Sequence, residues 1–493
     1  MKFSSLCLAC ACLISTHTFA QHDDSNHNEI EQATDTENIT AIELLQSLRD
    51  IQPDGFIQVP QIQRLHTEKG VTTLFVERHD LPMVDLQLTF NAGSARDTEI
   101  AAGLHGLANM TAKLMNKGTS KYTATDIAQR FEDLGAQFSV QAHRDMFIIR
   151  LRALSDAHKF KAAVELMLHV FNDAQFNTTE IQRSNQSVQM GQKQLQEKAS
   201  NLMSIRFQRA IYAQHPYAEP ITGTVASNQK ITCDDLNAFR KQFLVTENLN
   251  LALTGDLNTK KATEIANFIS KRIAEGTKAK ALPSHQLQDG FKLYHIVSNS
   301  SQANVLMGHL GTARDDPDRL ALELANRMLG GGGFNSILMQ ELRMKRGYTY
   351  AANSNMSFSS APGSFSLSYG TRQDQLIDSL NVAHQALIRF ATQPLDQAQL
   401  EATKSGMLLA FPNLFNSNAN INSLLGSMGY YEVSNDYIEN YQRNLKAITP
   451  EQVQAAVRRY LHPDKLTVVV ASSTLDQQQV LQQLQHNLSA VKP

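Results

Sequence analysis

Arg343 and Tyr350 stand seven positions apart in the segment ELRMKRGYTYAANSNMSF, where a helix is expected to end and a strand to follow. A guanidinium group can bind a substrate carbonyl or stabilise an oxyanion, and a phenol hydroxyl can donate a hydrogen bond beside it. The pair is therefore a candidate for binding a substrate. An arginine on a helix with a tyrosine on the next strand is also a common surface arrangement, and the two residues alone do not separate these interpretations. Arg346 and Tyr348 are weaker candidates nearby.

His105 lies in the segment GLHGLANMTAKLMNKGT, whose apolar residues Leu104, Leu107 and Leu114 recur at helical spacing. Residues 103–115 are therefore predicted to form an amphipathic helix. A single imidazole makes a poor metal site, because zinc is held by three or four protein ligands. We expect His105 to be hydrogen-bonded in the domain interior, with a metal site of unusual composition as the alternative.

Four consecutive glycines stand between two expected helices: Gly330, Gly331, Gly332 and Gly333. A phosphate-binding loop needs a preceding strand and a following Lys-Ser/Thr pair, and this segment has neither. We expect the glycines to end one helix and to act as a hinge before the next, with Asn335 or Ser336 as its N-cap. A loop that contacts substrate is the alternative.

The length and composition of the whole chain limit the number of domains and the kinds of partner that these candidate residues could serve. The chain has 493 residues, of which 42% are hydrophobic and 19% charged, with a formal net charge of −2. Such a length predicts two or more domains, each able to bury a full core. The near-neutral charge gives no electrostatic reason to expect nucleic acid or an anionic membrane surface as a partner.

The N-terminus is typical of an exported protein. Residues 1–20 have a positive start, an apolar run over 3–14 and small residues that end at Ala20, which predicts a signal peptide cleaved near Ala20. Cleavage would leave Cys233 as the one cysteine and hence no internal disulfide. Residues 21–53 are rich in polar and acidic residues and are expected to be flexible. We expect a periplasmic or secreted protein without stable membrane insertion, because no other segment reaches the roughly 18 apolar residues of a membrane helix.

Three pairs of segments repeat in the same order along the chain. ITCDDLNAFRKQFLVTENLNLALTG, from Ile231, aligns without a gap with ITPEQVQAAVRRYLHPDKLTVVVAS, from Ile448. Each copy predicts a helix opened by a Thr N-cap and a capping box, then an alternating strand. FIIRLRA, from Phe147, pairs with FSLSYGT, from Phe365, as alternating strands, and FNTTEI pairs with LDQAQL as helix starts.

The repeat predicts two homologous α+β domains, over residues 57–270 and 288–488. The segment EGTKAKALPSHQLQDG between them contains Gly, Lys and Pro, and predicts an exposed linker over 271–287. Sequential strands with helices gathered between them favour, in each domain, a mostly antiparallel or mixed sheet covered by helices.

With these segments the chain resembles the pitrilysin/insulinase family of zinc peptidases, whose motif H-x-x-E-H lies on a helix like that of residues 103–115. KGVTTLFVERHDLPMVDLQLTFNAGSARDT resembles the opening strands of the family, and LGGGGFNSILMQELRMKRGYTY resembles its glycine-rich and Arg/Tyr segments. The resemblance covers nearly the whole chain after the predicted signal peptide, and the architecture of two copies is itself a family trait.

The resemblance does not extend to the catalytic residues. His105, Ala108 and Asn109 stand where the motif has His, Glu and His. Ala108 has no group that could act as a base, and the amide oxygen of Asn109 is a poorer zinc ligand than an imidazole. The family takes its third ligand, a Glu, from a later helix, and here that helix has no acidic residue between Glu180 and Glu197. We therefore predict no metal in this chain and no peptidase activity of the chain alone.

What the resemblance implies instead is a complementary role. In the family, residues at the positions of Arg343 and Tyr350 bind the peptide backbone and face the metal across a chamber, and the glycine-rich loop of the processing subunits contacts substrate. Some members work as pairs of two-domain chains, one with the zinc site and the other with the Arg/Tyr pair. The leading hypothesis is a non-catalytic subunit of a periplasmic, heteromeric zinc metallopeptidase that helps to bind unfolded peptides, with zinc in a homologous partner that has the intact motif.

Two alternatives stay open at this point. One is a peptide-binding or assembly module without peptidase activity, for example as a homodimer. The other is a free-standing hydrolase with an unusual metal site.

Overall fold

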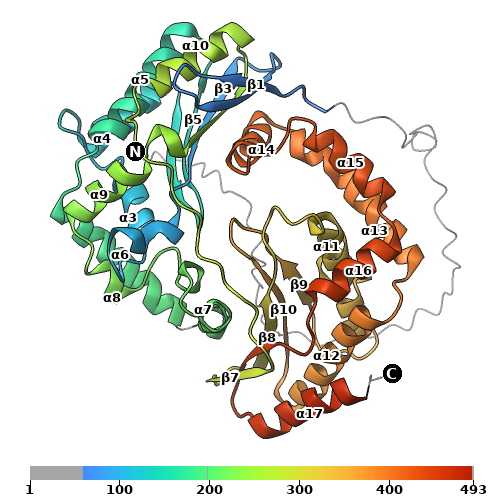
Figure 1. Cartoon of the computed structure of the whole chain (residues 1–493). Coiled ribbons are helices and arrows are strands. Elements are labelled where there is room, and N and C mark those ends of the chain that lie inside the picture. The colour runs from blue at the N-terminus through green and yellow to red at the C-terminus, as the bar shows by residue number, and fades with distance from the viewer. Residues whose placement is uncertain (1–58, 197, 491–493) are drawn as a thin grey trace, which may run out of the picture. The chain divides into compact units, whose positions relative to one another are not determined.

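The computed structural model of the chain describes residues 59–196 and 198–490. The predicted signal peptide over 1–20 and the predicted flexible tail over 21–53 lie outside these residues. Strands that precede the segment 271–287 form one sheet, and strands that follow it form a second sheet (Figure 1). Among the helices of the described residues, none is both long and apolar enough to cross a membrane.

The first sheet has six strands in the order β1-β2-β6-β3-β5-β4. Their bounds are β1 Gln63–His66, β2 Thr72–Glu77, β3 Met83–Phe90, β4 Gln137–Ala142, β5 Phe147–Leu154 and β6 Leu249–Gly255. β2 and β6 run parallel, and the other neighbouring strands run antiparallel. β3 is buried from its second residue to its last, which requires that both faces of the sheet are covered.

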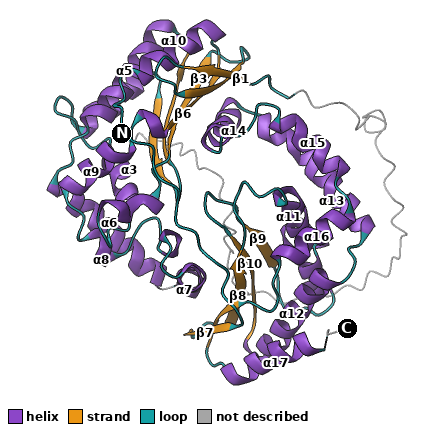
Figure 2. Ribbon diagram, viewed as in Figure 1, coloured by secondary structure: helices purple, strands orange, loops and turns teal. Residues whose placement is uncertain are grey.

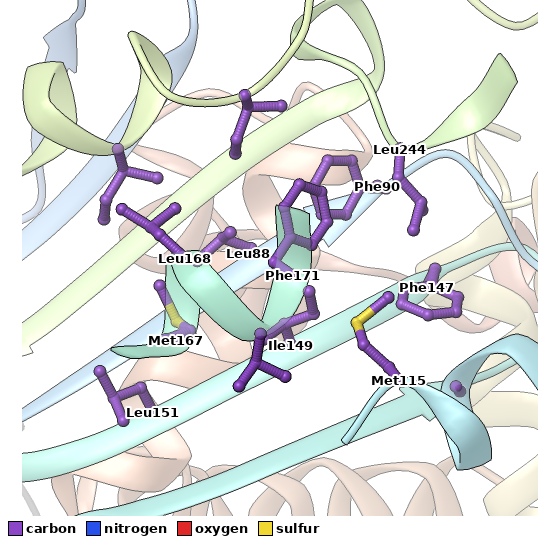
Figure 3. Close-up of a cluster of buried hydrophobic side chains, with 14 of the residues drawn as sticks. Leu88, Phe90, Met115, Phe147, Ile149, Leu151, Met167, Leu168, Phe171 and Leu244 are labelled. Carbon is purple, nitrogen blue, oxygen red and sulfur yellow. The ribbon is translucent and has the colours of Figure 1, made fainter. Parts of the chain in front are cut away.

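Several helices of the first half cover one face of this sheet. The helices of this half have the bounds α2 Asp97–Ile100, α3 Leu107–Leu114, α4 Ala124–Asp133, α5 Ala157–Asp173, α6 Thr178–Gln196, α7 Ala199–Tyr212, α8 Val225–Asn228, α9 Cys233–Phe243 and α10 Thr259–Ser270. The core lies between the sheet and α3, α5, α9 and α10, and part of it is shown in Figure 3. In this core the rings of Phe90 (β3) and Phe171 (α5) stack with their centroids 5.6 Å apart.

The second sheet has five strands in the order β7-β11-β8-β10-β9. Their bounds are β7 Lys292–Val297, β8 Gln302–Leu310, β9 Ala352–Met356, β10 Ser364–Arg372 and β11 Thr467–Ser472. The helices of this half are α11 Arg319–Asn326, α12 Leu376–Thr392, α13 Gln397–Ala410, α14 Asn418–Tyr430, α15 Tyr437–Ala447, α16 Pro450–Tyr460 and α17 Gln477–Ser489 (Figure 2). β7 and β11 run parallel, and the remaining neighbours run antiparallel.

The two halves repeat one topology. The order β7-β11-β8-β10-β9 follows the order β2-β6-β3-β5-β4 strand by strand, with the single parallel pair at the same place. The helices α9 and α16 both begin after a threonine, Thr232 or Thr449, in a reciprocal capping box. The predicted α+β fold with two homologous halves, each a mostly antiparallel sheet covered by helices, is confirmed.

One helix from each half packs on the sheet of the other half. α7 contacts β7, β8 and β11, while α14 contacts β2, β3 and β6. The approach of α14 is close at Gly426, where an added Cβ would lie 1.9 Å from the side-chain nitrogen of Gln87 on β3. These two helices close the second face of each sheet with apolar side chains, so the halves share part of their cores.

Candidate functional site

The segment around His105 begins with a turn where the sequence predicted a helix. Gly103 and Gly106 have φ angles of +80° and +99°, and helix α3 begins only at Leu107. A Cβ on residue 106 would also lie 2.8 Å from the carbonyl oxygen of Thr222. The prediction that the helix begins at Gly103 is therefore wrong, because residues with left-handed φ angles do not continue a right-handed helix.

Asp97 caps the start of α3 from outside the helix. Its Oδ2 accepts a hydrogen bond of 2.7 Å from the backbone N–H of Gly106, and its Oδ1 accepts one of 2.8 Å from that of Ala108. Burial raises the pKa of Asp97 to about 8, even though hydrogen bonds from the backbone of residues 106–108 lower it. The chain itself therefore satisfies the N–H groups that a helix start would otherwise offer to a ligand.

His105 lies in this turn and not on the helix. Its ring is partly buried, and burial lowers its pKa while the nearby carboxylate of Glu219 raises it. The carbonyl of His105 accepts a hydrogen bond of 2.7 Å from Oγ of Ser227. The ring itself has no hydrogen-bond partner among the residues that the structure describes, in contrast to the interior hydrogen bond that we expected.

The residues at the three motif positions do not fit a zinc ion. The side chain of Ala108 is a methyl group that is fully buried, and Asn109 offers an amide on a helix that His105 does not share. In residues 59–196 and 198–490, no three His, Cys, Asp or Glu side chains are grouped so that they could hold a metal. The vestigial motif His105, Ala108 and Asn109 thus supplies neither a ligand set nor a general base.

Arg343 and Tyr350 are brought together in the second half. Arg343 lies near the end of a π-helical segment, Met339–Met344, and its Nη1 donates a hydrogen bond of 2.7 Å to the carbonyl oxygen of Tyr350. The guanidinium also lies over the ring of Phe334, 4.7 Å from its centroid. The contact between the pair therefore runs through the backbone of Tyr350. Tyr350 itself lies in the loop before β9 and not on the predicted strand.

The side chains around Arg343 are unusually exposed for apolar groups. Phe334 is 59% exposed, Met344 60% and Tyr350 76%, and they account for three of the eight exposed large hydrophobic side chains of the described residues. We name Phe334, Arg343, Met344 and Tyr350 the Arg343 patch. A cation over one exposed ring, with further exposed apolar residues close to it along the chain, is typical of a binding surface. Phe334 and Met344 were not predicted, although a phenylalanine directly after four glycines was a usable signal.

The acidic group nearest in sequence to Arg343 is occupied by other cations. Glu341 accepts hydrogen bonds from Lys345 (2.6 Å), Arg346 (2.9 Å) and Arg389 (3.3 Å). Although burial raises the pKa of Glu341, these hydrogen bonds and charges lower it overall. Arg343 forms no ion pair with any residue that the structure describes, so its charge is left for a ligand.

The glycine run separates two helical segments and packs on an edge strand. Gly330 lies close to β9, and an added Cβ on it would lie 2.5 Å from the backbone nitrogen of Ser354. Oγ of Ser354 donates a hydrogen bond of 2.8 Å to Oδ1 of Asn326, which ties this strand to the end of α11. Gly333 has a φ of +70° and directly precedes Phe334. The glycines thus let the chain cover the edge of the sheet and turn Phe334 outward.

Comparison with protein families finds two adjacent matches. The family described as "Insulinase (Peptidase family M16)" matches residues 73–225, and the domain described as "Peptidase M16 inactive domain" matches residues 230–407. A crystal structure of a peptidase M16 inactive domain from Pseudomonas fluorescens is 33% identical and has a TM-score of 0.79, with 84% of this chain and 98% of that chain covered.

Relatives of lower sequence identity include proteins named as proteases and a protein named as a non-peptidase. The "Non-peptidase homolog YmxG" of Helicobacter pylori is 24% identical over 345 residues, which are 69% of this chain and 78% of that protein. An "Uncharacterized zinc protease" of Rickettsia felis is 25% identical over 313 residues, which are 63% of this chain and 73% of that protein. Both peptidases and non-peptidases are therefore named among similar proteins.

Proposed function

Because this chain belongs to the insulinase (M16) family of peptidases and is a homologue of its inactive type, we propose that it is the non-catalytic subunit of a heteromeric zinc metallopeptidase of the periplasm. In this role the Arg343 patch helps to bind an unfolded peptide. The observation that carries the proposal is the contrast between the halves. The turn at His105 does not fit zinc, whereas Arg343 is held in place and keeps its charge unpaired among the described residues.

The chemistry of the Arg343 patch suits an extended peptide. The bond from Nη1 to the Tyr350 carbonyl and the contact with the Phe334 ring hold the guanidinium, which keeps further N–H groups for a peptide carbonyl or carboxylate. The exposed side chains of Phe334, Met344 and Tyr350 offer apolar contacts to the side chains of the same peptide. An unfolded segment presents both kinds of group along its length.

Three further considerations support the role. The printed name of the Helicobacter pylori relative is that of a non-peptidase, and the Pseudomonas fluorescens structure is named an inactive domain. The N-terminal sequence is typical of a signal peptide, which supports a location of the complex in the periplasm or outside the cell. A homologous subunit with the intact zinc motif would hold the metal, and this chain contributes peptide binding alone.

The experiment compares the purified chain alone with the chain mixed with a homologue that has the intact H-x-x-E-H motif. The chain alone is expected to contain no stoichiometric zinc and to leave an unfolded peptide uncleaved, while the mixture cleaves it. Arg343→Ala is expected to lower cleavage by the mixture by about 10- to 100-fold, the loss of roughly 1.4 to 3 kcal/mol of charged hydrogen bonding. Arg372→Ala is the matched control, because Arg372, the last residue of β10, is an exposed arginine that pairs with Asp374.

Other outcomes would contradict the proposed role or identify one of the alternative functions. Full activity of the mixture with Arg343→Ala and Tyr350→Phe combined would contradict the role of the Arg343 patch. Peptide binding by the chain without any association with a zinc-motif homologue would identify a peptide-binding or assembly module. Cleavage by the pure chain together with stoichiometric metal would identify a free-standing hydrolase.

A further inference from the structure

A polar cavity of about 310 Å³ lies where α7 of the first half meets the second sheet. α7 contributes Ser204 and Gln208 to its wall, and strands β9 and β10 contribute Asn355 and Ser366. Such a volume corresponds to about ten water molecules at the density of liquid water. The cavity is therefore large enough for a small polar ligand or the end of a peptide, and too small for a folded partner.

Arg144 is the cation of this cavity. Its Nη1 donates to the carbonyl oxygens of Tyr217 (2.8 Å) and Glu219 (3.2 Å), which holds the guanidinium in place. Its Nε and Nη2 donate to no residue in the described part of the chain. The guanidinium thus has unused donors in the fork geometry that matches a carboxylate or a phosphate.

The cavity wall contains no acidic side chain that could neutralise Arg144. Asp145 is the next residue in the chain, but its two carboxylate oxygens are occupied. One accepts the hydroxyl of Tyr217, and the other accepts a hydrogen bond of 2.9 Å from the backbone N–H of Ser360. Burial lowers the pKa of Arg144, and the charge of the neighbouring Asp145 opposes this effect. The Asp145 carboxylate is not part of the cavity wall, so a ligand in the cavity would meet the guanidinium and no acidic side chain.

Further polar groups in the wall lack partners. Oε1 of Gln208 is buried without a hydrogen bond to any described residue. The hydroxyl groups of Ser359 and Ser366 are partly exposed and make no hydrogen bond within residues 59–196 and 198–490, so they are open to a ligand in the cavity. A buried polar atom without a partner is uncommon in folded proteins, and its position beside a cation and two open hydroxyl groups indicates a ligand.

We propose that this cavity binds a small oxyanion, a carboxylate or phosphate group, between the guanidinium of Arg144 and the hydroxyl groups of Ser359 and Ser366. The amide of Gln208 turns its nitrogen or its oxygen to the ligand as required. The group comes either from a free anion or from the C-terminal carboxylate of a peptide. Because Arg144 belongs to the first half and the serines to the second, the ligand joins the two halves, and its binding raises the thermal stability of the chain.

The test titrates the purified chain at low salt with inorganic phosphate, with acetate, and with one short peptide as its free acid and as its C-terminal amide. Calorimetry and the melting temperature are recorded. The variant is Ser366→Asp, which places a negative charge in the cavity without removing Arg144. Ser368→Asp is the matched control, because Ser368 lies on the same strand and face, is exposed, and is not part of the cavity wall.

A saturable rise in melting temperature is expected for the wild type and for Ser368→Asp, with an affinity at least about tenfold weaker in Ser366→Asp, because like charges repel at short range. Binding of the free-acid peptide but not of its amide identifies a peptide terminus as the source, and binding of phosphate or acetate identifies a free anion. Absence of saturable binding by all four probes overturns the proposal. Equal affinities in wild type and Ser366→Asp overturn it as well.

Discussion

Two buried histidines, His309 and His384, make the stability of the second half depend on pH. The ring of His309 is fixed by two hydrogen bonds, in which one ring nitrogen donates and the other accepts. Its Nδ1 donates to the carbonyl oxygen of Leu310 (2.8 Å), and its Nε2 accepts the backbone N–H of His462 (3.1 Å). This pattern is satisfied only by the neutral imidazole, because a protonated Nε2 would face another donor.

His384 is fixed in the same way by groups close to the first site. Its Nε2 lies 2.8 Å from the carbonyl oxygen of Pro463 and donates to it. Its Nδ1 lies 3.3 Å from the amide nitrogen of Asn487 and accepts from it. The two histidines therefore hold the turn between α16 and β11. Protonation of His309 breaks its bond to His462 in that turn, and protonation of His384 breaks its bond to Asn487 on α17.

The size and sign of the effect follow from linkage. Burial lowers the pKa of both histidines from 6.5 to about 4. Between these values the unfolded chain binds more protons than the folded chain, so the free energy of unfolding falls as the pH falls. The contribution is fully present above pH 6.5 and is lost progressively toward pH 4. From pH 7 to pH 5 each histidine removes about 2 kcal/mol, and the two together remove about 4 kcal/mol.

The assay measures urea unfolding by circular dichroism at both pH values for the wild type and for the double variant His309→Gln/His384→Gln. The double variant is less stable at pH 7, but its loss of stability on acidification is expected to be about 4 kcal/mol smaller than that of the wild type. His158→Gln is the control, because His158 is exposed on α5. Equal losses in the wild type and the double variant would refute the assignment of the acid sensitivity to these two sites.

Three further predictions concern the site and the packing. Restoring the motif with Ala108→Glu and Asn109→His is expected to leave zinc below about 0.1 equivalent by elemental analysis, and to lower the free energy of unfolding by about 3 kcal/mol or more, because residue 108 is fully buried. Stoichiometric zinc would contradict this reasoning. Gly426→Ala is expected to cost about 1–3 kcal/mol in the same unfolding assay, since its methyl group would overlap the side chain of Gln87. Gly406→Ala is expected to stabilise the chain by about 0.5–1 kcal/mol, because Gly406 lies in a helix and an added Cβ would meet open space. A loss of stability in Gly406→Ala would contradict the open space around this position.

Much of the fold was predictable because the sequence repeats local signals. The capping boxes at Thr232 and Thr449 and the alternating strands from Phe147 and Phe365 all lie where they were predicted. Such signals depend on neighbouring residues alone, so they are legible in a sequence. The exchange of α7 and α14 between the halves was not predicted, because an apolar helix face does not indicate which of two sheets it will cover.

The site was predictable in its residues but not in its contacts. The spacing of Arg343 and Tyr350 was sufficient to bring the two residues together, yet the bond is made to a backbone carbonyl, which no side-chain pattern reports. The exposure of Phe334 depends on the left-handed conformation of Gly333, and a glycine run is compatible with many conformations. The turn at His105 was missed for the same reason, because the apolar spacing there continued through Gly106.

The backbone conformation at His105, as well as the side chains at the motif positions, differs from what a zinc peptidase needs. A motif of the type H-x-x-E-H works because one helix presents its first and last residues on the same face, one turn apart. Here Gly106, with a φ of +99°, interrupts that turn, and the carboxylate of Asp97 takes up the N–H groups that the interrupted turn leaves. A return to metal binding would therefore need a different backbone at residues 103–106 as well as new side chains at Ala108 and Asn109.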